Sequence, residues 1–294
     1  AAPISPVHRV APTIWLMSVS LAVFEYLTDL RTTAWLVAPV GAFCFELGVP
    51  ASLALFAAVA HTDPGKVPPQ PAHKSVVQDF LEALRQPSGS EVPDFDRLCT
   101  STWVRKGLRT KYCKRTGACV EEFDHFCGWL NVAIGRGNHR TFIVLALVEV
   151  LTQICHLYLI WTVSSHIVQY SNPGRLLPAV AAGYPVMVII GVLQVLTAPA
   201  ICLLLLNHLR LVAINLTTNE MINAHRYSHL WVEAGLPDSK GKSQRVFRNP
   251  FHKGSVYANC LDFWWNRRRG LIGPPVAFRG CELAEISDER NKAA

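Results

Sequence analysis

Reactive side chains gather in one short stretch, Asp124-His125-Phe126-Cys127-Gly128-Trp129. A cysteine thiol is a good nucleophile only as the thiolate, and a neighbouring imidazole can take its proton. A carboxylate can orient that imidazole and stabilise its charged form. We therefore predict a nucleophilic site in which Asp124 orients His125 and His125 activates Cys127. The alternative is a polar turn beside a buried structural cysteine, since closely spaced Asp, His and Cys do not by themselves define a catalytic site.

Long apolar runs flank this stretch and determine where it can lie. Half of the 294 residues are hydrophobic and only 17% are charged, against about a quarter in soluble domains. A helix needs about 20 mostly apolar residues to cross a bilayer. We predict four spans, at residues 13–27, 34–60, 142–167 and 184–211. A removed signal peptide is the weaker interpretation of the first span, because no small-residue cleavage site follows it.

Basic residues predict the orientation of the spans, because loops rich in Lys and Arg stay in the cytosol. Of the 28 basic residues, twelve lie within residues 61–141 and thirteen from residue 210 onward, but only Arg31 and Arg175 lie in the two short turns. Both termini and the central loop are therefore expected in the cytosol, where disulfides are rare. The net charge of +7 fits anionic lipid or a phosphate-bearing ligand, and we predict no nucleic-acid partner, since no nucleic-acid motif accompanies it.

Three glutamates and a histidine within or near the spans need an explanation, because ionisable groups there are costly and usually functional or paired. They are Glu25, Glu46, Glu149 and His156. Glu149 could line the mouth of a ligand cavity. A protonated carboxyl group bonded inside the helix bundle is the alternative for each glutamate.

Several further motifs surround the reactive stretch in a fixed order. Those near it are Leu98 to Arg109 (LCTSTWVRKGLR), Cys119-Val120, Gly135, Asn138-His139 and Phe142. Those farther away are Asp63-Pro64-Gly65 after the second span, Thr217-Thr218-Asn219-Glu220 after the fourth, and Asn249-Pro250-Phe251, Gly254, Asn259 and Asp262-Phe263 in the tail. Together they resemble the DHHC protein acyltransferases over nearly the whole chain, and their details are most similar to the ankyrin-repeat branch.

The resemblance implies an all-α membrane protein with four transmembrane helices and a cytosolic, cysteine-rich catalytic loop between the second and third. It also implies a protein S-acyltransferase, typically a palmitoyltransferase. Cys127 would attack acyl-CoA, hold the acyl group as a thioester and pass it to a protein cysteine, with His125 as general base and Asp124 orienting it. Acyl-CoA is then a co-substrate, and no prosthetic group is expected. The partners are acyl-CoA, membrane-associated protein substrates and the lipid bilayer.

The resemblance assigns supporting roles to residues outside the reactive stretch. Thr217, Thr218 and Glu220 are expected to tie the tail to the catalytic loop, and Asn259 to anchor the tail near the fourth span. Three basic residues near the reactive stretch are candidates to meet the CoA phosphates. They are Arg105, Lys106 and Arg109, with solvated or lipid-facing charges as an equal alternative.

The chain departs from the family at the two zinc sets of its cysteine-rich domain. A structural zinc needs four ligands. The first set keeps Cys99 and Cys119 but has Thr102 and Tyr112 in its other places, and the second keeps only Cys113, with Thr116, Phe126 and Ala133. His139 and Cys155 are unsupported substitutes, so we predict no bound metal. Packing of Trp103, Phe123, Phe126, Trp129 and Phe142, with hydrogen bonds from Tyr112 and the threonines, would then hold the loop.

Two other functions compete with the acyltransferase. Loss of the zinc ligands suggests a catalytically inactive family member that acts as a membrane scaffold or substrate-binding protein, although the reactive set is kept. A transporter is the weaker alternative, because four spans without symmetric halves or broken helices do not fit one.

The predicted domains follow the spans. They are residues 1–62 with the first two helices, a linker at 63–94, the catalytic domain at 95–141, the last two helices at 142–212 and a cytosolic tail at 213–294. An upstream ankyrin-repeat domain is expected from the branch, and the Golgi is the expected membrane.

Overall fold

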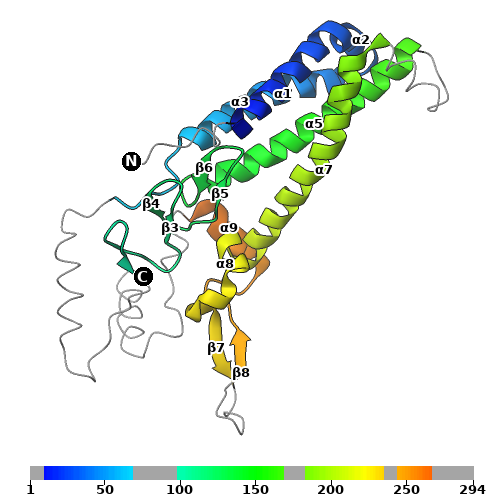
Figure 1. Cartoon of the computed structure of the whole chain (residues 1–294). Helices are drawn as coiled ribbons and strands as arrows, with labels where there is room; N and C mark the ends of the chain where they lie inside the picture. Colours follow the sequence, from blue (N-terminus) through cyan, green and yellow to red (C-terminus); the bar gives the residue numbers. More distant parts are fainter. Residues whose placement is uncertain (1–9, 69–97, 169–182, 235–243, 267–294) are drawn as a thin grey trace, which may run out of the picture. The chain divides into compact units, whose positions relative to one another are not determined.

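The computed structural model describes residues 10–68, 98–168, 183–234 and 244–266. Four of its helical stretches are long and apolar enough to cross a membrane: Val10–Val37, Pro39–His61, His139–His166 and Pro185–Ile214. The first comprises α1 (Val10–Glu25), η2 (Tyr26–Leu30) and α2 (Arg31–Val37), and the others are α3 (Pro39–His61), α5 (His139–Val168) and α7 (Pro185–Ile214) (Figure 1). Each exceeds the length that a bilayer core requires, which confirms the predicted fold class.

The break between the first two spans lies at Ala38, and the predicted position of the turn is wrong. Residues 28–33, the expected turn, are helical. Ala38 instead leaves the helical conformation, with φ −146° and ψ 58°. Pro39 explains this break, because a proline ring disfavours a helical residue before it while proline itself fits the first helical turn. Arg31 therefore begins α2 and does not lie in the turn.

The residues group into two compact units. The first is drawn from Ala1–Asp63, Phe126–Val132 and Asn138–His208, and the second from Pro64–His125, Ala133–Gly137 and Leu209–Ala294. The first unit contains most of each long helix. The second contains short hairpins, the last turn of α7 and the described parts of the tail.

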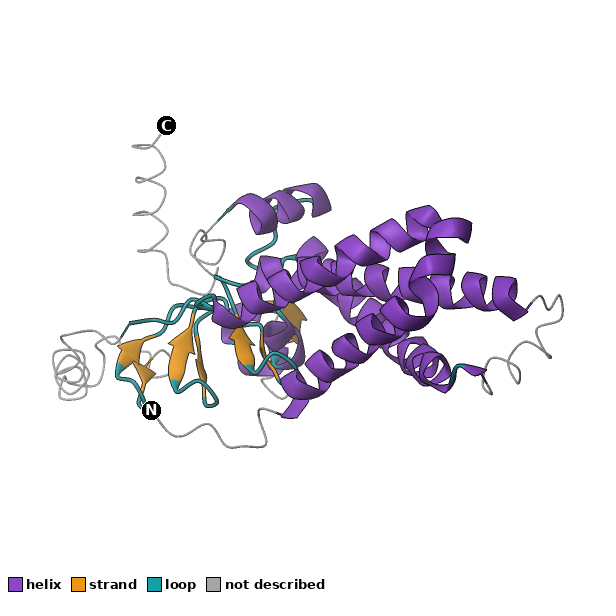
Figure 2. Ribbon diagram, turned by 90° about the horizontal axis from the view of Figure 1, so that it is seen from above, coloured by secondary structure: helices purple, strands orange, loops and turns teal. Residues whose placement is uncertain are grey.

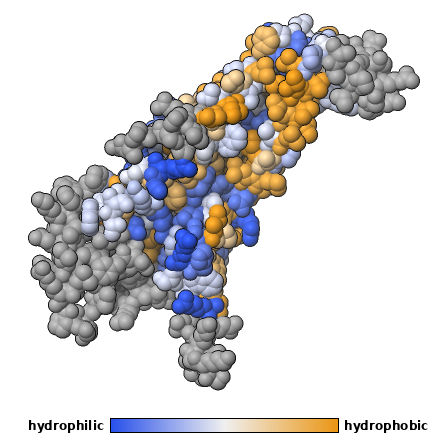
Figure 3. All heavy atoms as spheres, viewed as in Figure 1, coloured by the Kyte–Doolittle hydropathy of each residue, from blue (hydrophilic) through white to orange (hydrophobic). Residues whose placement is uncertain are grey.

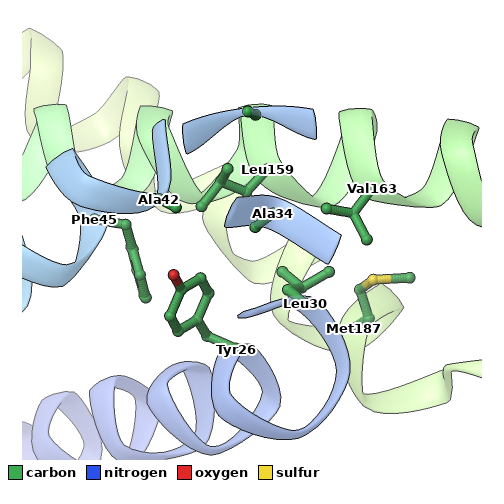
Figure 4. Close-up of a cluster of buried hydrophobic side chains, with 9 residues drawn as sticks. Tyr26, Leu30, Ala34, Ala42, Phe45, Leu159, Val163 and Met187 are labelled. Atoms are coloured by element: carbon green, nitrogen blue, oxygen red, sulfur yellow. The ribbon is translucent and has the colours of Figure 1, made fainter. Parts of the chain in front are cut away.

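A hydrophobic core joins the helices of the first unit (Figure 4). Its buried members are Tyr26, Leu30, Ala34, Ala38, Ala42, Phe45, Leu159, Val163 and Met187. Helix α3 approaches α5 closely at Gly48, where an added Cβ would collide with the side chain of Thr152. Small residues permit such approach, and close packing is a main source of helix association in lipid.

The ionisable residues of the spans are paired. Glu25 Oε2 lies 2.9 Å from His156 Nε2, and His156 Nδ1 lies 3.0 Å from Gln194 Oε1, so one buried network joins α1, α5 and α7. Glu149 accepts a hydrogen bond from Gln153. Glu46 Oε1 accepts hydrogen bonds from Tyr26, Arg31 and Trp35. The structure thus favours the paired-group interpretation for these residues.

Hydrophobic side chains also cover the outer surface of the long helices (Figure 3). Leu36, Leu196 and Leu203 are 77%, 68% and 68% exposed. A soluble protein rarely exposes apolar surface on this scale, whereas lipid chains would cover it without cost. The surface therefore agrees with the membrane class that helix length and composition indicate.

Short strands dominate the loop (Figure 2). Antiparallel pairing joins β1 (Leu98–Cys99) to β2 (Val104–Arg105) and β3 (Lys111–Cys113) to β4 (Ala118–Val120). Strands β5 (His125–Cys127) and β6 (Val132–Ile134) follow. The tail begins with α8 (Thr218–Ile222) and two 3₁₀ turns, η4 (Ala224–Arg226) and η5 (Ser228–Leu230). It continues with the antiparallel pair β7 (Trp231–Ala234) and β8 (Gln244–Phe247) and ends, within the described part, with α9 (Val256–Trp265).

The chain that leaves α3 is built into the second unit by close backbone contacts. Gly65 adopts a positive φ of 98°, and its carbonyl accepts a hydrogen bond from Glu121 N. A Cβ on Gly135 would lie 2.7 Å from the carbonyl oxygen of Pro64, so only glycine fits there. The sequence motif at Asp63-Pro64-Gly65 therefore has a structural role. Most of the predicted linker, residues 63–94, lies outside the described residues.

The prediction that aromatic side chains form the core of the loop is wrong for its two tryptophans. Trp103 and Trp129 are 39% and 61% exposed, while Phe123 and Phe126 are half-buried and Phe142 is buried. Trp103 has a positive φ of 53° in the turn between β1 and β2. Aliphatic side chains fill the loop interior in place of the tryptophans, namely Val104, Val120 and Ile134.

Candidate active site

Backbone hydrogen bonds to two other parts of the loop fix the residues that lead into β5. Asp124 N donates to the carbonyl of Ile134 at 2.8 Å, and Phe123 N donates to that of Arg109 at 3.1 Å. Alternate residues of a strand point to the same side. Strand β5 therefore carries His125 and Cys127 on one side and Phe126 on the other.

Asp124 and His125 form the carboxylate–imidazole pair that the sequence predicted. His125 Nδ1 lies 2.7 Å from Asp124 Oδ2, and the carboxylate side chain is completely buried while the imidazole is 25% exposed. The carboxylate fixes the proton of the neutral ring on Nδ1, so Nε2 is the nitrogen that can accept another. A buried carboxylate also stabilises the imidazolium that forms when it does.

The second oxygen of Asp124 is held by the tail. Thr218 N, in the first turn of α8, donates to Asp124 Oδ1 at 2.8 Å. Thr217 caps the same helix: its side chain accepts from Glu220 N, and the Glu220 carboxylate accepts from Thr217 N at 2.8 Å. This capping box fixes the turn that presents Thr218 to Asp124. These contacts bring the residues expected to tie the tail to the catalytic loop next to Asp124; their role in catalysis stays a prediction.

Glu220 makes a second connection to the loop, through a buried ion pair with Arg109. Both nitrogens, Nε and Nη2, lie 2.8 Å from the two carboxylate oxygens, and the side chains are 2% and 3% exposed. Burial alone lowers the pKa of Arg109, but the charge and hydrogen bonds of Glu220, together with the charges of Glu122 and Asp262, raise that pKa overall. Phe251 lies under the guanidinium, 4.0 Å from its ring centroid. Bidentate geometry of this kind is the stable way to bury two charges.

Arg109 therefore does not serve the predicted CoA contact, because its guanidinium is buried and bound within the protein. Arg109 instead has a positioning role, as the partner that holds Glu220. Lys106 is half-buried, and the Arg105 side chain lies outside what the structure describes. These two stay candidates for the CoA phosphates.

Asn215 is a site residue that the sequence analysis missed. Its Oδ1 and its carbonyl accept from Arg109 Nη1 and Nη2, at 3.1 and 2.8 Å. Its Nδ2 donates to the carbonyl of Phe251 and to Asp262 Oδ2. Asn215 has a positive φ of 52°, just after α7. An Asn that follows a long apolar run is a known helix-ending signal and could have marked this position.

The tail is fastened to the end of α7 by asparagines. Asn259 Nδ2 donates to the carbonyl of Ala213 at 2.8 Å, and its Oδ1 accepts from Lys253 N. Asn249 Nδ2 donates to the carbonyl of Ile214 at 2.6 Å. These bonds satisfy carbonyls in the last turn of a helix, which otherwise lack partners. Asn259 was predicted to anchor the tail near the fourth span, and the structure places it in contact with the last turn of α7.

Cys127 ends β5 with its side chain buried, at 8% exposure. A thiol with so little contact with solvent cannot be a general surface nucleophile. Buried cysteines are commonly inert, so the case for Cys127 rests on its neighbours Asp124 and His125 and not on its exposure.

The residues at the zinc positions do not fit a structural zinc. In the first set, Cys99 and Cys119 are buried and Thr102 Oγ1 lies 3.4 Å from Cys119 Sγ, but Tyr112 is exposed at 37%. A threonine hydroxyl bonded to a thiol and an exposed phenol do not complete a set of four zinc ligands.

The second zinc set is less complete. Thr116 Oγ1 donates to the backbone carbonyl of Cys113 at 3.3 Å, and Phe126 and Ala133 offer no ligand atom. His139, a considered substitute, lies within the first unit with its Nε2 3.3 Å from His208 Nδ1. No step of the chemistry is therefore assigned to zinc.

Comparison with known proteins identifies a domain that contains the candidate active site. Residues 92–225 match the family model of the DHHC palmitoyltransferase. The chain is 28% identical over 244 residues to human "Palmitoyltransferase ZDHHC12", covering 81% of this chain and 85% of that protein. It is 35% identical over 132 residues to "Palmitoyltransferase AKR1" of Lachancea kluyveri, covering 44% of this chain and 17% of the relative.

A further relative extends the comparison. "Palmitoyltransferase ZDHHC17" of Danio rerio is 29% identical over 189 residues, which cover 62% of this chain and 28% of the relative. The chain thus spans less than a third of the length of the AKR1 and ZDHHC17 relatives and most of the length of ZDHHC12.

Proposed function

We propose that this chain, which belongs to the DHHC palmitoyltransferase family, is a protein S-acyltransferase that uses Cys127 as its acyl carrier. One observation carries the proposal. Asp124, His125 and Cys127 stand on one short segment, and the carboxylate is buried and fixed to His125 Nδ1 at 2.7 Å and to Thr218 N at 2.8 Å. A buried carboxylate must be paired and hydrogen-bonded, and this one is bonded to the imidazole two residues from Cys127.

The first half-reaction forms the acyl-enzyme. His125 takes the thiol proton of Cys127, and the thiolate attacks the carbonyl carbon of the acyl-CoA thioester. The bond from this carbon to the CoA sulfur breaks, and the CoA thiolate leaves with a proton from the imidazolium. Asp124 stabilises the imidazolium between these two proton transfers.

The second half-reaction repeats the chemistry with a protein cysteine. The thiolate of the acceptor attacks the Cys127 thioester, and Cys127 leaves with the proton that His125 returns. We propose membrane-associated proteins with cytosolic cysteines as acceptors and a long-chain acyl group, typically palmitoyl, as the cargo. Arg105 and Lys106 are proposed to contact the CoA phosphates. The cytosolic placement of the loop rests on the distribution of basic residues, and the Golgi on the family's usual membrane.

The family expectation of an upstream ankyrin-repeat domain stays part of the proposal. It is supported by the resemblance to AKR1 and ZDHHC17, whose length extends well beyond the region they share with this chain. The match to ZDHHC12, by contrast, covers 85% of that protein.

Autoacylation tests the proposal. Purified protein in detergent is mixed with a labelled fatty acyl-CoA, beside Cys127→Ser and, as a matched control, Cys113→Ser, which removes another buried loop thiol. We expect hydroxylamine-labile label on the wild type and on Cys113→Ser, and none on Cys127→Ser. No label on a folded wild type would instead favour the inactive scaffold, and equal label on Cys127→Ser would place the nucleophile elsewhere.

A further inference from the structure

The buried side chain of Asn215 connects a cation of the loop to an anion of the tail through the two ends of one amide. Its Oδ1 accepts a hydrogen bond from Arg109 Nη1 at 3.1 Å, and its Nδ2 donates to Asp262 Oδ2 at 2.9 Å. A guanidinium can only donate hydrogen bonds, and an ionised carboxylate can only accept them. An amide satisfies both neighbours, because it accepts at one end and donates at the other.

The backbone of Asn215 takes part in the same contact. Its carbonyl accepts from Arg109 Nη2 at 2.8 Å, and its φ of 52° turns the chain directly after α7. Asparagine and glycine tolerate a positive φ better than most other residues do. The position therefore needs an amide side chain and a left-handed backbone together, and asparagine provides both.

Arg109 extends this contact to the catalytic segment by two routes. Its backbone carbonyl accepts from Phe123 N at 3.1 Å, directly before Asp124 in the chain. Its side chain pairs with Glu220, whose carboxylate also closes the capping box that presents Thr218 N to Asp124. A displaced Arg109 would therefore disturb the setting of Asp124 from the loop and from the tail.

The other end of the amide leads to helix α9. Asp262 lies in α9, and its second oxygen, Oδ1, accepts from Asn266 Nδ2 at 2.9 Å. Asn215 Nδ2 also donates to the carbonyl of Phe251 at 2.9 Å, and the Phe251 ring lies under the guanidinium of Arg109. The tail therefore reaches Arg109 through the amide of Asn215 and through the ring of Phe251.

We propose that Asn215 and Asp262 are positioning residues for the acylation of Cys127. They hold Arg109 in the place from which it fixes the orientation of Asp124. The inference rests on the proposed acyltransfer and adds to it two residues that lie far from the reactive stretch in the sequence. Because a displacement of about 1 Å remote from the chemistry can cost about 10²-fold in rate, loss of the amide should slow the chemical step.

Single-turnover acylation of the full chain in detergent tests the role of Asn215. Asn215→Gly keeps the left-handed backbone and removes the amide. With labelled palmitoyl-CoA over a range of concentrations, we expect the maximal rate of Cys127 labelling to fall by about 10- to 100-fold. The concentration that gives half of the maximal rate should stay within about twofold of the wild-type value, as expected when orientation is lost and binding is kept.

Two substitutions of Asp262 separate its hydrogen bond from general packing. Asp262→Leu offers no acceptor to Asn215 Nδ2, and its maximal rate should fall about as far as that of Asn215→Gly. Asp262→Asn still offers an oxygen and should recover most of that loss. Equal rates in the two Asp262 variants would contradict the role of this bond. The pair also decides the question if Asn215→Gly does not fold.

Ser255→Ala is the matched control, because Ser255 Oγ caps α9 by accepting from Ala258 N, away from the bonds of Asn215. Loss of the cap should lower Tm while the maximal rate stays within about twofold of the wild-type value. An equal fall in rate in Ser255→Ala and Asn215→Gly would overturn the inference, since a loosened tail would then be the cause. A folded Asn215→Gly that labels Cys127 at the wild-type rate would overturn it while the acyltransferase stands. A wild type that does not label Cys127 would overturn the proposed function itself.

Discussion

The catalytic segment and the former zinc position lie in one loop but have changed in opposite ways. The catalytic segment keeps its reactive residues, and the tail and Ile134 hold Asp124 through hydrogen bonds at 2.8 Å. At the zinc position, Thr102 bonds to a thiol and Tyr112 is exposed. Polar contacts from the tail therefore fix the carboxylate of the catalytic segment, whereas the first zinc set is incomplete and its two cysteines are buried. Four variants, two matched control variants and one chelator experiment can break or sharpen this comparison.

The largest effect is expected at Asp124. Asp124→Asn removes the charge that stabilises the imidazolium and favours the wrong histidine tautomer, which costs about 10⁴-fold in hydrolase triads. We expect single-turnover acylation of Cys127 by labelled acyl-CoA to fall by about 10³- to 10⁴-fold. The melting temperature should change little in comparison. A rate within about tenfold of the wild type would show that the carboxylate serves only the fold.

The next effect concerns the ion pair that holds the tail to the loop. Arg109→Met removes the guanidinium that neutralises the buried Glu220 carboxylate, and breaking a buried ion pair typically costs about 3–5 kcal/mol. Arg136→Met is the matched control, since its ion pair with Glu121 is 30% exposed on both sides and should contribute at most about 1 kcal/mol. Thermal melting in detergent compares the two.

The double variant Arg109→Met/Glu220→Leu sharpens this result. Replacing both charges with apolar groups should recover most of the lost stability. The acylation rate of the double variant should nevertheless be low, because the capping box that presents Thr218 to Asp124 needs the Glu220 carboxylate. Full recovery of acylation would mean that α8 does not position Asp124.

A smaller effect is expected at the former zinc position. Thr102→Val removes the hydroxyl bonded to Cys119, which is worth about 1 kcal/mol. Thr116→Val, whose hydroxyl donates to the Cys113 carbonyl, is the matched control. We expect both to lower Tm slightly and to leave the acylation rate within about twofold of the wild type. A collapse of the fold in Thr102→Val alone would mean that this threonine is the main replacement for the metal.

The smallest effect is that of a chelator. Because the residues at the two zinc positions do not complete a set of four ligands, EDTA should change neither Tm nor the acylation rate. Elemental analysis should find zinc well below one atom per chain. A large fall in Tm after chelation, reversed by added zinc, would contradict the assignment of both zinc sets as incomplete.

Sequence patterns predicted the membrane class, and they also indicated which side chains would meet near the reactive stretch. Four apolar runs are a strong signal because only helices of that length cross lipid. The Asp124–His125 contact is predictable because adjacent residues cannot lie far apart. The capping box from Thr217 to Glu220 also has a local sequence pattern.

What the sequence could not predict depends on contacts between distant residues. The helix break at Ala38 is different, because it is set by Pro39, a local signal that the limits of the apolar runs did not use. Arg109 looked available for a phosphate because its partners, Glu220 and Asn215, lie more than 100 residues away. Trp103 and Trp129 seemed suited to a core, yet their exposure follows from turn geometry that hydrophobicity does not encode.

The most direct test of the central claim is a chase of the acyl group. A short pulse of labelled palmitoyl-CoA would be followed by excess unlabelled acyl-CoA and a cysteine-bearing acceptor peptide. Mass spectrometry would then locate the labelled acyl group over time. The account predicts that it sits on Cys127 after the pulse and appears on the peptide at the rate at which it leaves Cys127. Acyl transfer to the peptide that never passes through Cys127, or a Cys127 adduct that the peptide cannot discharge, would contradict it.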